Sequence, residues 1–103
     1  MSANRECFEM CVNFVLKNPA FELVHGVVNS VDRSDMPYAW VKKGAKVYDV
    51  ENDKWFEANE WTNQAMEQNT YAYQEVERLV DYTGHPGPWS KKEYELSSAK
   101  PSL

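Results

Sequence analysis

The chain has 103 residues, of which 43% are apolar, 26% charged and 14% aromatic. Eleven basic and sixteen acidic residues give a net charge of −5, which argues against a protein that binds nucleic acid through a basic face. The composition also argues against a disordered chain, a collagen and a disulfide-rich miniprotein. No apolar run is long enough to span a bilayer and the N-terminus lacks a signal-peptide core, so we expect one small soluble domain in the cytoplasm.

The first third of the chain predicts a helix and then a buried strand. Residues 4–17 carry apolar side chains three and four positions apart, which indicates a helix with one apolar stripe. Pro19 ends this helix, because the residue before a proline is disfavoured in the helical region. Residues 21–30 are rich in Val and apolar on both faces, which is typical of a strand in the middle of a sheet.

A β-hairpin is predicted next, after a polar link over residues 31–36. Residues 38–41 and 46–50 read as strands, and Gly44 between them can adopt the positive φ of a tight turn. With the preceding strand they make a three-stranded antiparallel sheet, and the N-terminal helix packs against it. The expected fold class is therefore α+β.

Two C-terminal helices complete the expected domain, which covers residues 1–89. Residues 55–66 contain aromatic and apolar side chains without a clean helical period, whereas residues 72–83 show a clear apolar stripe. Gly84 stands where the left-handed residue after a helix is expected. Residues 90–103 are polar and are expected to form a flexible tail.

Cys7 is the first residue with a candidate chemical role. A thiol early in a helix gains thiolate character from the helix dipole, and a nucleophile of this kind also needs a base and a group that orients the base. Asp49, near the end of a predicted strand, could orient such a base. The simpler interpretation is that Cys7 and Cys11 are core residues, since free cysteine is among the most buried residue types.

Several short motifs together carry a resemblance to a known group of proteins. They are Cys7-Phe8-Glu9, Asn18-Pro19, Leu23-Val24-His25-Gly26, Tyr38-Ala39-Trp40-Val41, Val47-Tyr48-Asp49, Thr83-Gly84-His85 and Gly87-Pro88-Trp89. Their order and spacing resemble a group of short bacterial and phage proteins with a minimal papain-like, or transglutaminase-like, cysteine fold. This resemblance implies a helix that bears the nucleophilic Cys, a strand that bears the catalytic His and a following strand that bears Asp.

The resemblance assigns the nucleophile position to Cys7 and the orienting acid to Asp49, but the position of the catalytic His is occupied by Tyr38. Met10 stands where the group often has Asn. A phenol with an unperturbed pKa near 10 is a poor general base at neutral pH. The resemblance therefore implies a cysteine-hydrolase ancestry and a triad that has lost its base.

The two histidines leave alternatives open. His25, on the preceding strand, could serve as an unorthodox base, although a strand histidine bound to a backbone carbonyl or water is the simpler interpretation. His85 reads as a turn residue near Trp89. Zinc could be held by the two cysteines and two histidines, but their spacing is not that of a zinc motif, so no metal and no cofactor is expected.

An acidic and aromatic segment over residues 49–67 suggests a protein-binding face. Exposed Trp among carboxylates is typical of contact surfaces, whereas the simpler interpretation places the Trp side chains in the core. The candidate binding residues are Tyr38, Trp40, Trp55 and Trp61.

We expect a non-catalytic protein-interaction protein on a degenerate cysteine-hydrolase scaffold, of phage or mobile-element origin and acting on a host or cellular protein. We expect no nucleic-acid or membrane partner, and a monomer or small homo-oligomer. One alternative is an active thiol peptidase, amidase or acyltransferase that uses Cys7 with His25 and Asp49. Another is a small-ligand or nucleotide-binding module.

Overall fold

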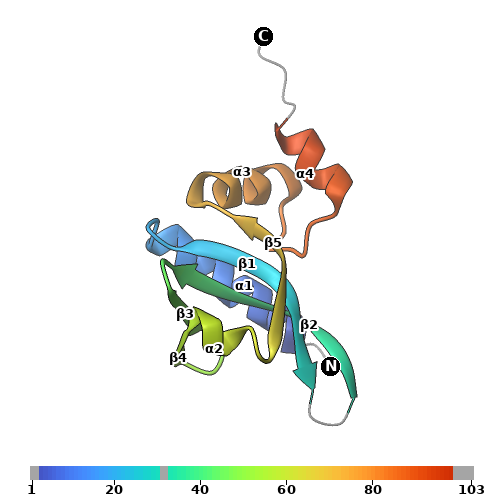
Figure 1. The fold of residues 1–103 in the computed structure, drawn as a ribbon. Helices are drawn as coiled ribbons and strands as arrows, with labels where there is room; N and C mark the ends of the chain where they lie inside the picture. The colour runs from blue at the N-terminus through green and yellow to red at the C-terminus, as the bar shows by residue number, and fades with distance from the viewer. Residues whose placement is uncertain (1–2, 31–32, 99–103) are drawn as a thin grey trace.

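The computed structural model describes residues 3–30 and 33–98, which form an α+β fold around one antiparallel sheet (Figure 1). The strand order in the sheet is β4-β3-β2-β1-β5. The strands are β1 (Glu22–Ser30), β2 (Arg33–Lys43), β3 (Lys46–Asp49), β4 (Lys54–Glu57) and β5 (Ala65–Tyr71). The helices are α1 (Ala3–Lys17), α2 (Ala58–Trp61), α3 (Tyr73–Thr83) and α4 (Lys91–Ser98).

The predicted N-terminal helix is confirmed as α1, which packs along β2 and β1 (Figure 1). Its apolar stripe is completely buried at Cys7, Cys11 and Val15. The helix ends at Lys17, and the side-chain amide of Asn18 donates to the free carbonyl of Phe14 at 2.9 Å. A side chain thus satisfies one of the backbone acceptors that every helix end leaves open.

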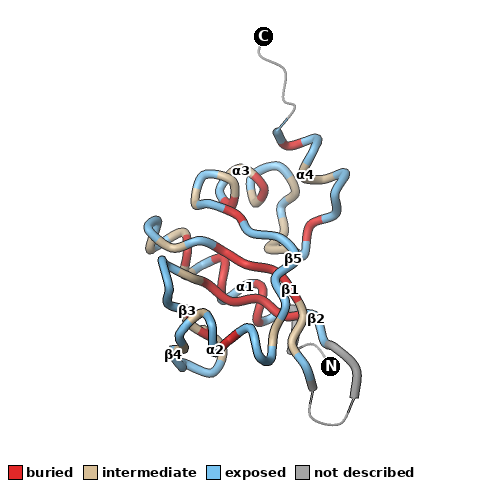
Figure 2. Tube along the Cα trace, viewed as in Figure 1, coloured by how far each residue is buried: buried red, intermediate tan, exposed pale blue. Residues whose placement is uncertain are grey.

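The central strands follow the predicted pattern, with β1 paired to β2 and β2 to β3. β1 has a strand on each side, and the buried segments in Figure 2 concentrate on β1, β2 and α1. Gly44 adopts a φ of 60° in the turn between β2 and β3, as the hairpin requires. Of the expected polar link, residues 31 and 32 lie outside the described residues, and the part from residue 33 onward belongs to β2.

The predicted sheet of three strands is wrong, because the described chain forms five. Residues 55–66 do not form one helix: they span most of β4, the single-turn helix α2 and the start of β5. Trp55 and Phe56 sit on opposite faces of β4, paired with Tyr48 and Val47 of β3. Most residues of β5 are exposed, so its sequence lacks the apolar pattern that predicts a strand. β5 nevertheless pairs with β1 and is the second neighbour that this buried strand needs.

Of the two predicted C-terminal helices, the second is confirmed as α3, and Gly84 follows it with a φ of 76°. The expected flexible tail contains a further helix, α4, which packs against α3. Ser90 and Glu93 begin α4 with reciprocal hydrogen bonds between side chain and backbone, of 2.8 and 3.0 Å. Ser97 on its inner side is buried, and residues 99–103 of the tail lie outside the described residues.

Gly26 lies at a point where the central strands leave no room for a side chain. A Cβ built on Gly26 would stand 2.2 Å from the carbonyl oxygen of Met66 in β5 and 2.8 Å from the ring of Trp40. Trp40 is itself completely buried. The close approach of β5 to β1 therefore requires glycine at this position.

We expect Gly26→Ala to lower the free energy of unfolding by about 3 kcal/mol and to weaken the pairing of β5 with β1, because the backbone of Met66 has to move. Urea denaturation and amide hydrogen exchange of β5 measure the two effects. Gly84→Ala is the matched control, since its Cβ meets nothing within 4 Å and its positive φ alone costs about 1 kcal/mol. Equal stability of the two variants, with unchanged protection of β5, would contradict the packing argument.

Candidate functional site

The thiol of Cys7 is bound by the backbone of one strand residue. Its Sγ donates to the carbonyl oxygen of Ala39 at 3.2 Å and accepts from the amide of Ala39 at 3.3 Å. β3 pairs with β2 only from Val41 onward, so Ala39 lies beyond the end of that ladder. The thiol therefore takes the place of a strand partner, and with 0% of its surface exposed Cys7 has no access to solvent.

Cys11 lies one helical turn further along and is equally buried. The neighbouring thiol of Cys7 is the largest cause that raises the pKa of Cys11 above its usual value, and burial adds to it. Both cysteines are free. The apolar stripe of α1 thus holds a protonated thiol at Cys11 beside the backbone-bound thiol of Cys7.

Tyr38 and Asp49, which the sequence resemblance assigns to the other two positions of a triad, are joined by a buried hydrogen bond. The phenol of Tyr38 donates to Asp49 Oδ1 at 2.8 Å, and both residues are more than nine-tenths buried. Asn52 completes the network, because its side-chain amide donates to Asp49 Oδ2 at 2.9 Å and to the Tyr38 oxygen at 3.2 Å. The network fastens the turn after β3 to β2.

This environment keeps the phenol of Tyr38 protonated. Burial is the largest cause that raises the pKa of Tyr38 above its usual value, followed by the hydrogen bond to Asp49 and the charge of Asp49. A group that holds its own proton so firmly cannot accept one from a thiol. Tyr38 consequently acts here as a hydrogen-bond donor and not as a base.

A cavity of about 480 Å³ opens beside this network, on the side of the sheet that bears α2. Tyr38, Asp49 and Asn52 line one part of it, and Phe56 and Trp61 line another. Three residues singled out from the sequence, Tyr38, Asp49 and Trp61, are thereby brought together. Asn52 was missed, although an Asn three positions after a strand-ending Asp is a common local pattern for turns.

His25 lies in an aromatic enclosure, and no hydrogen bond joins it to the Cys7 thiol among the described residues. Its ring is 4.6 Å from that of Phe8, 5.1 Å from that of Tyr71 and 5.2 Å from that of Trp89, measured between ring centroids. Within the described residues its Nε2 has no hydrogen-bond partner. Burial lowers the pKa of His25 from 6.5 to about 4, so the ring is neutral at physiological pH.

His85 holds the turn before α4. Its Nε2 lies 2.9 Å from Glu93 Oε2, and its Nδ1 accepts from the amide of Gly87 at 3.1 Å. Its carbonyl oxygen accepts from Nε1 of Trp89 at 3.0 Å. His85 thus orders the segment that brings Trp89 to the ring of His25.

The four candidate binding aromatics divide into buried and exposed. Tyr38, Trp40 and Trp61 are buried, whereas 56% of the surface of Trp55 is exposed. Trp55 stacks on Tyr48, with ring centroids 4.6 Å apart and planes at 28°. The hydroxyl of Tyr48 in turn donates to Asp53 at 2.6 Å. Trp55 is therefore an exposed indole on a fixed support.

Cys7 is expected to be unreactive in the folded protein, because its thiol is buried and hydrogen-bonded on both sides. In the Cys11→Ser variant Cys7 is the one thiol that can be alkylated. We expect iodoacetamide to alkylate it at least about 100-fold more slowly in the folded chain than in the urea-unfolded chain. Mass spectrometry over time measures both rates. A folded-state rate equal to the unfolded one, with a midpoint well below pH 8.5, would instead indicate an activated nucleophile.

His25 makes stability depend on pH. Its pKa is lower in the folded than in the unfolded chain, so the unfolded state binds the proton first as the pH falls below about 6.5, and the loss of stability levels off below the folded pKa of about 4. From this group alone we expect a loss of about 2 kcal/mol between pH 7 and pH 5.

Urea denaturation of His25→Phe at the two pH values tests this, because the variant keeps an aromatic ring but cannot titrate. His85→Asn is the control that removes the other histidine. If the wild type and His25→Phe lose the same stability between pH 7 and pH 5, the conclusion that His25 is buried in its neutral form is wrong.

Comparisons of the chain with family models, with curated proteins and with solved structures found no match. In the parts of the chain that the structure describes, no three His, Cys, Asp or Glu side chains are grouped closely enough to hold a metal ion. In the same residues, no helix combines the length and apolar character needed to cross a membrane. The candidate functional features are thus three separate ones: the backbone-bound Cys7 thiol, the Tyr38–Asp49–Asn52 network beside its cavity, and the exposed Trp55.

Proposed function

We propose that this protein is a non-catalytic interaction protein that binds another protein through the surface around Trp55. The proposal includes four expectations from the sequence: a cysteine-hydrolase ancestry, a phage or mobile-element origin, a host protein as partner and a cytoplasmic location. The two free cysteines agree with a cytoplasmic location, because thiols stay reduced there. The observation that carries it is the exposure of Trp55 on an otherwise ordered aromatic stack.

The absence of catalysis is supported by the way the three triad positions are used. Cys7 lies on a helix, Tyr38 on a strand and Asp49 on the next strand, which are the element types that the resemblance implies. The proton of the Cys7 thiol, however, is directed to a backbone carbonyl and the phenol of Tyr38 to a carboxylate. Both hydrogen bonds stabilise the packing of α1 and the turn after β3, and neither prepares a nucleophile.

The Trp55 surface has the physical properties of a binding anchor. Trp and Tyr dominate the binding energy of protein interfaces, and a ring that is already fixed loses little conformational entropy on binding. Phe21 packs 6.1 Å from Trp55 and 5.0 Å from Phe14, so the stack continues into the edge of the core. A partner that covers Trp55 would thus remove apolar area from water without rearranging the protein.

The charges of the segment indicate the chemistry of the partner. Of the carboxylates between residues 49 and 67, Asp49 is buried, while Asp53, Glu57, Glu60 and Glu67 are exposed. Glu57 and Glu67 form ion pairs with lysines of β3 and β2, so Asp53 and Glu60 are the exposed carboxylates of this segment that have no ion pair among the described residues. The whole chain carries a net charge of −5. We therefore expect a partner surface that combines basic side chains with an apolar or arginine-bearing centre, which can stack on an indole.

The test compares Trp55→Ala with Tyr82→Ala, which removes an aromatic ring of similar exposure, 53%, from α3. Proteins that bind the immobilised chain from a lysate of the source cells are identified by mass spectrometry, and each candidate partner is then purified for measurement of its Kd. We expect Trp55→Ala to weaken the binding of one partner by about tenfold or more, because truncation of a central Trp removes a dominant contact.

Tyr82→Ala should leave the same Kd unchanged, and the thermal unfolding of both variants verifies that they are folded. The proposal is contradicted if the wild-type chain retains no protein, or if every retained protein binds Trp55→Ala as tightly as the wild type.

A further inference from the structure

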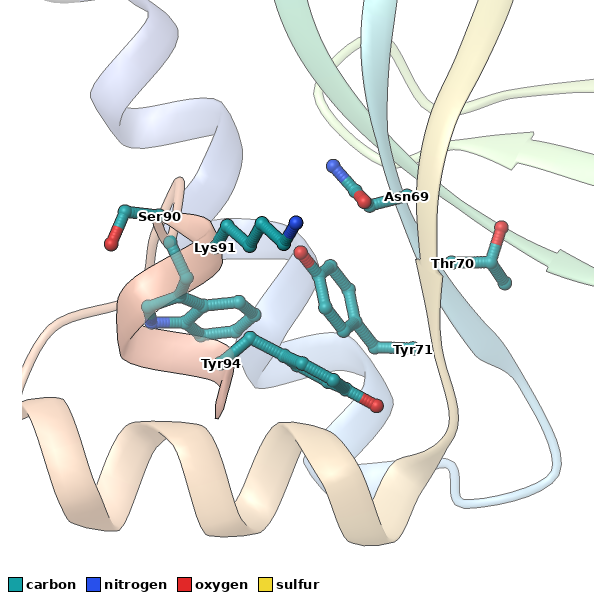
Figure 3. Close-up of a pocket in the computed structure, with 7 residues that line it drawn as sticks. Asn69, Thr70, Tyr71, Ser90, Lys91 and Tyr94 are labelled. Carbon is teal, nitrogen blue, oxygen red and sulfur yellow. The ribbon is translucent and has the colours of Figure 1, made fainter. Parts of the chain in front are cut away.

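A second cavity, of about 460 Å³, lies between the end of β5 and the first turn of α4 (Figure 3). Its floor is aromatic: Tyr71 and Trp89 meet edge to face with centroids 5.1 Å apart, and Tyr94 lies 6.1 Å from Tyr71. Tyr71 and Trp89 are more than nine-tenths buried. The hydroxyl of Tyr94 is held by Glu75 at 2.6 Å, so the cavity is preformed.

Lys91 is the charged residue that lines this cavity. Figure 3 shows its side chain extending over the cavity toward Tyr71 and Asn69. Among the described residues, no carboxylate lies within ion-pair distance of Lys91, and the nearby Glu93 is engaged by His85 and by the amide of Ser90. The cavity thus offers an unpaired ammonium above an apolar floor, which is complementary to a carboxylate next to an apolar side chain.

β5 adds an open row of backbone groups beside the cavity. It is an edge strand, paired with β1 on one side only, and its residues at positions 69–71 line the cavity. An edge strand presents unpaired N–H and C=O groups that accept an added strand. Side chains of such a strand alternate between faces, so every second one would lie on the same face as Asn69 and Tyr71, toward the aromatic floor.

We propose that this cavity and the edge of β5 bind the C-terminal end of an extended peptide of a partner protein. The peptide backbone pairs with β5, its terminal carboxylate accepts hydrogen bonds from Nζ of Lys91, and its last side chain, aromatic or aliphatic, covers the rings of Tyr71 and Trp89. Because β5 runs toward the cavity and ends there at Tyr71, the carboxyl end of the peptide lies at the same end, and the added strand is parallel to β5.

This site is distinct from the surface around Trp55 and does not depend on it. β4, which bears Trp55, and β5 are the opposite edge strands of the sheet. A free carboxylate alone would use only Lys91, whereas an extended peptide uses the ammonium, the aromatic floor and the open strand edge together. The peptide end is therefore the occupant that matches all three features.

The experiment uses acetylated hexapeptides of alternating Thr and Val that end in Phe, Leu, Tyr or Trp, each as a free acid and as a C-terminal amide. Isothermal titration calorimetry with the full chain measures Kd. We expect at least one free acid to bind, and its amide to bind about tenfold more weakly, because the charge-assisted hydrogen bond is lost. Methylation of alternate backbone nitrogens of the peptide should weaken binding by a similar factor, because strand pairing is lost.

Lys91→Gln should weaken the binding of the free-acid peptide until its Kd equals that of the amide, and it should leave the Kd of the amide unchanged. Lys92→Gln, the matched control on the same helix, does not line the cavity and should change neither. Trp55→Ala should also leave peptide binding unchanged, so failure of this site and failure of the proposed function are separable. The inference is overturned if no free acid binds at millimolar concentration, if acids and amides bind equally, or if Lys91→Gln acts no differently from Lys92→Gln.

Discussion

The burial of Trp40 in the middle of the sheet is the constraint on which the rest of the structure depends. Its indole is completely enclosed, and it fits there because Gly26 on the neighbouring strand has no side chain. Trp61 covers it from α2, with ring centroids 5.3 Å apart. So large an apolar side chain contributes much of the driving force for folding a chain of this size. The indole nitrogens of Trp40 and Trp61 have no partner among the described residues, a cost that their buried area outweighs.

The small size of the core also decides which hydrogen bonds the Cys7 thiol and the Tyr38 phenol make. In a chain of about 100 residues, few side chains can be spared from the core. Cys7 satisfies the backbone of Ala39 where the strand ladder ends, and Tyr38 satisfies Asp49 where the turn begins. The hydrogen bonds of Cys7, Tyr38 and Asp49 therefore stabilise the fold.

The two binding sites that we propose lie at the two edges of the sheet. Trp55 projects from the edge strand β4, and the cavity beneath Lys91 opens beside the other edge strand, β5. Both sites combine fixed aromatic rings with exposed polar groups, which is the usual composition of a binding anchor and its rim. The three central strands separate the two edges, so the two proposed sites are distinct.

Local patterns in the sequence were sufficient to predict the elements that are marked by a periodic row of apolar residues or by a glycine at a turn or helix end. The stripe of α1, the two-faced apolar run of β1, the hairpin turn at Gly44 and the stripe and cap of α3 all appear where the pattern predicts them. Most of the candidate residues could also be named from the sequence, because the chain has few Cys, His and Trp residues. Their contacts could not be named, because they depend on which strands become neighbours.

The sequence by itself therefore determined the class of the fold, the places of α1, β1 and α3, and the residue types available for chemistry. Only the tertiary structure decided that residues 55–66 divide between two strands and a single helical turn, since β5 is held by pairing with β1 and not by its own apolar pattern. It likewise decided that Cys7 binds a backbone while Trp55 stays exposed. Burial and hydrogen bonding arise from contacts between distant segments, and no local pattern records them.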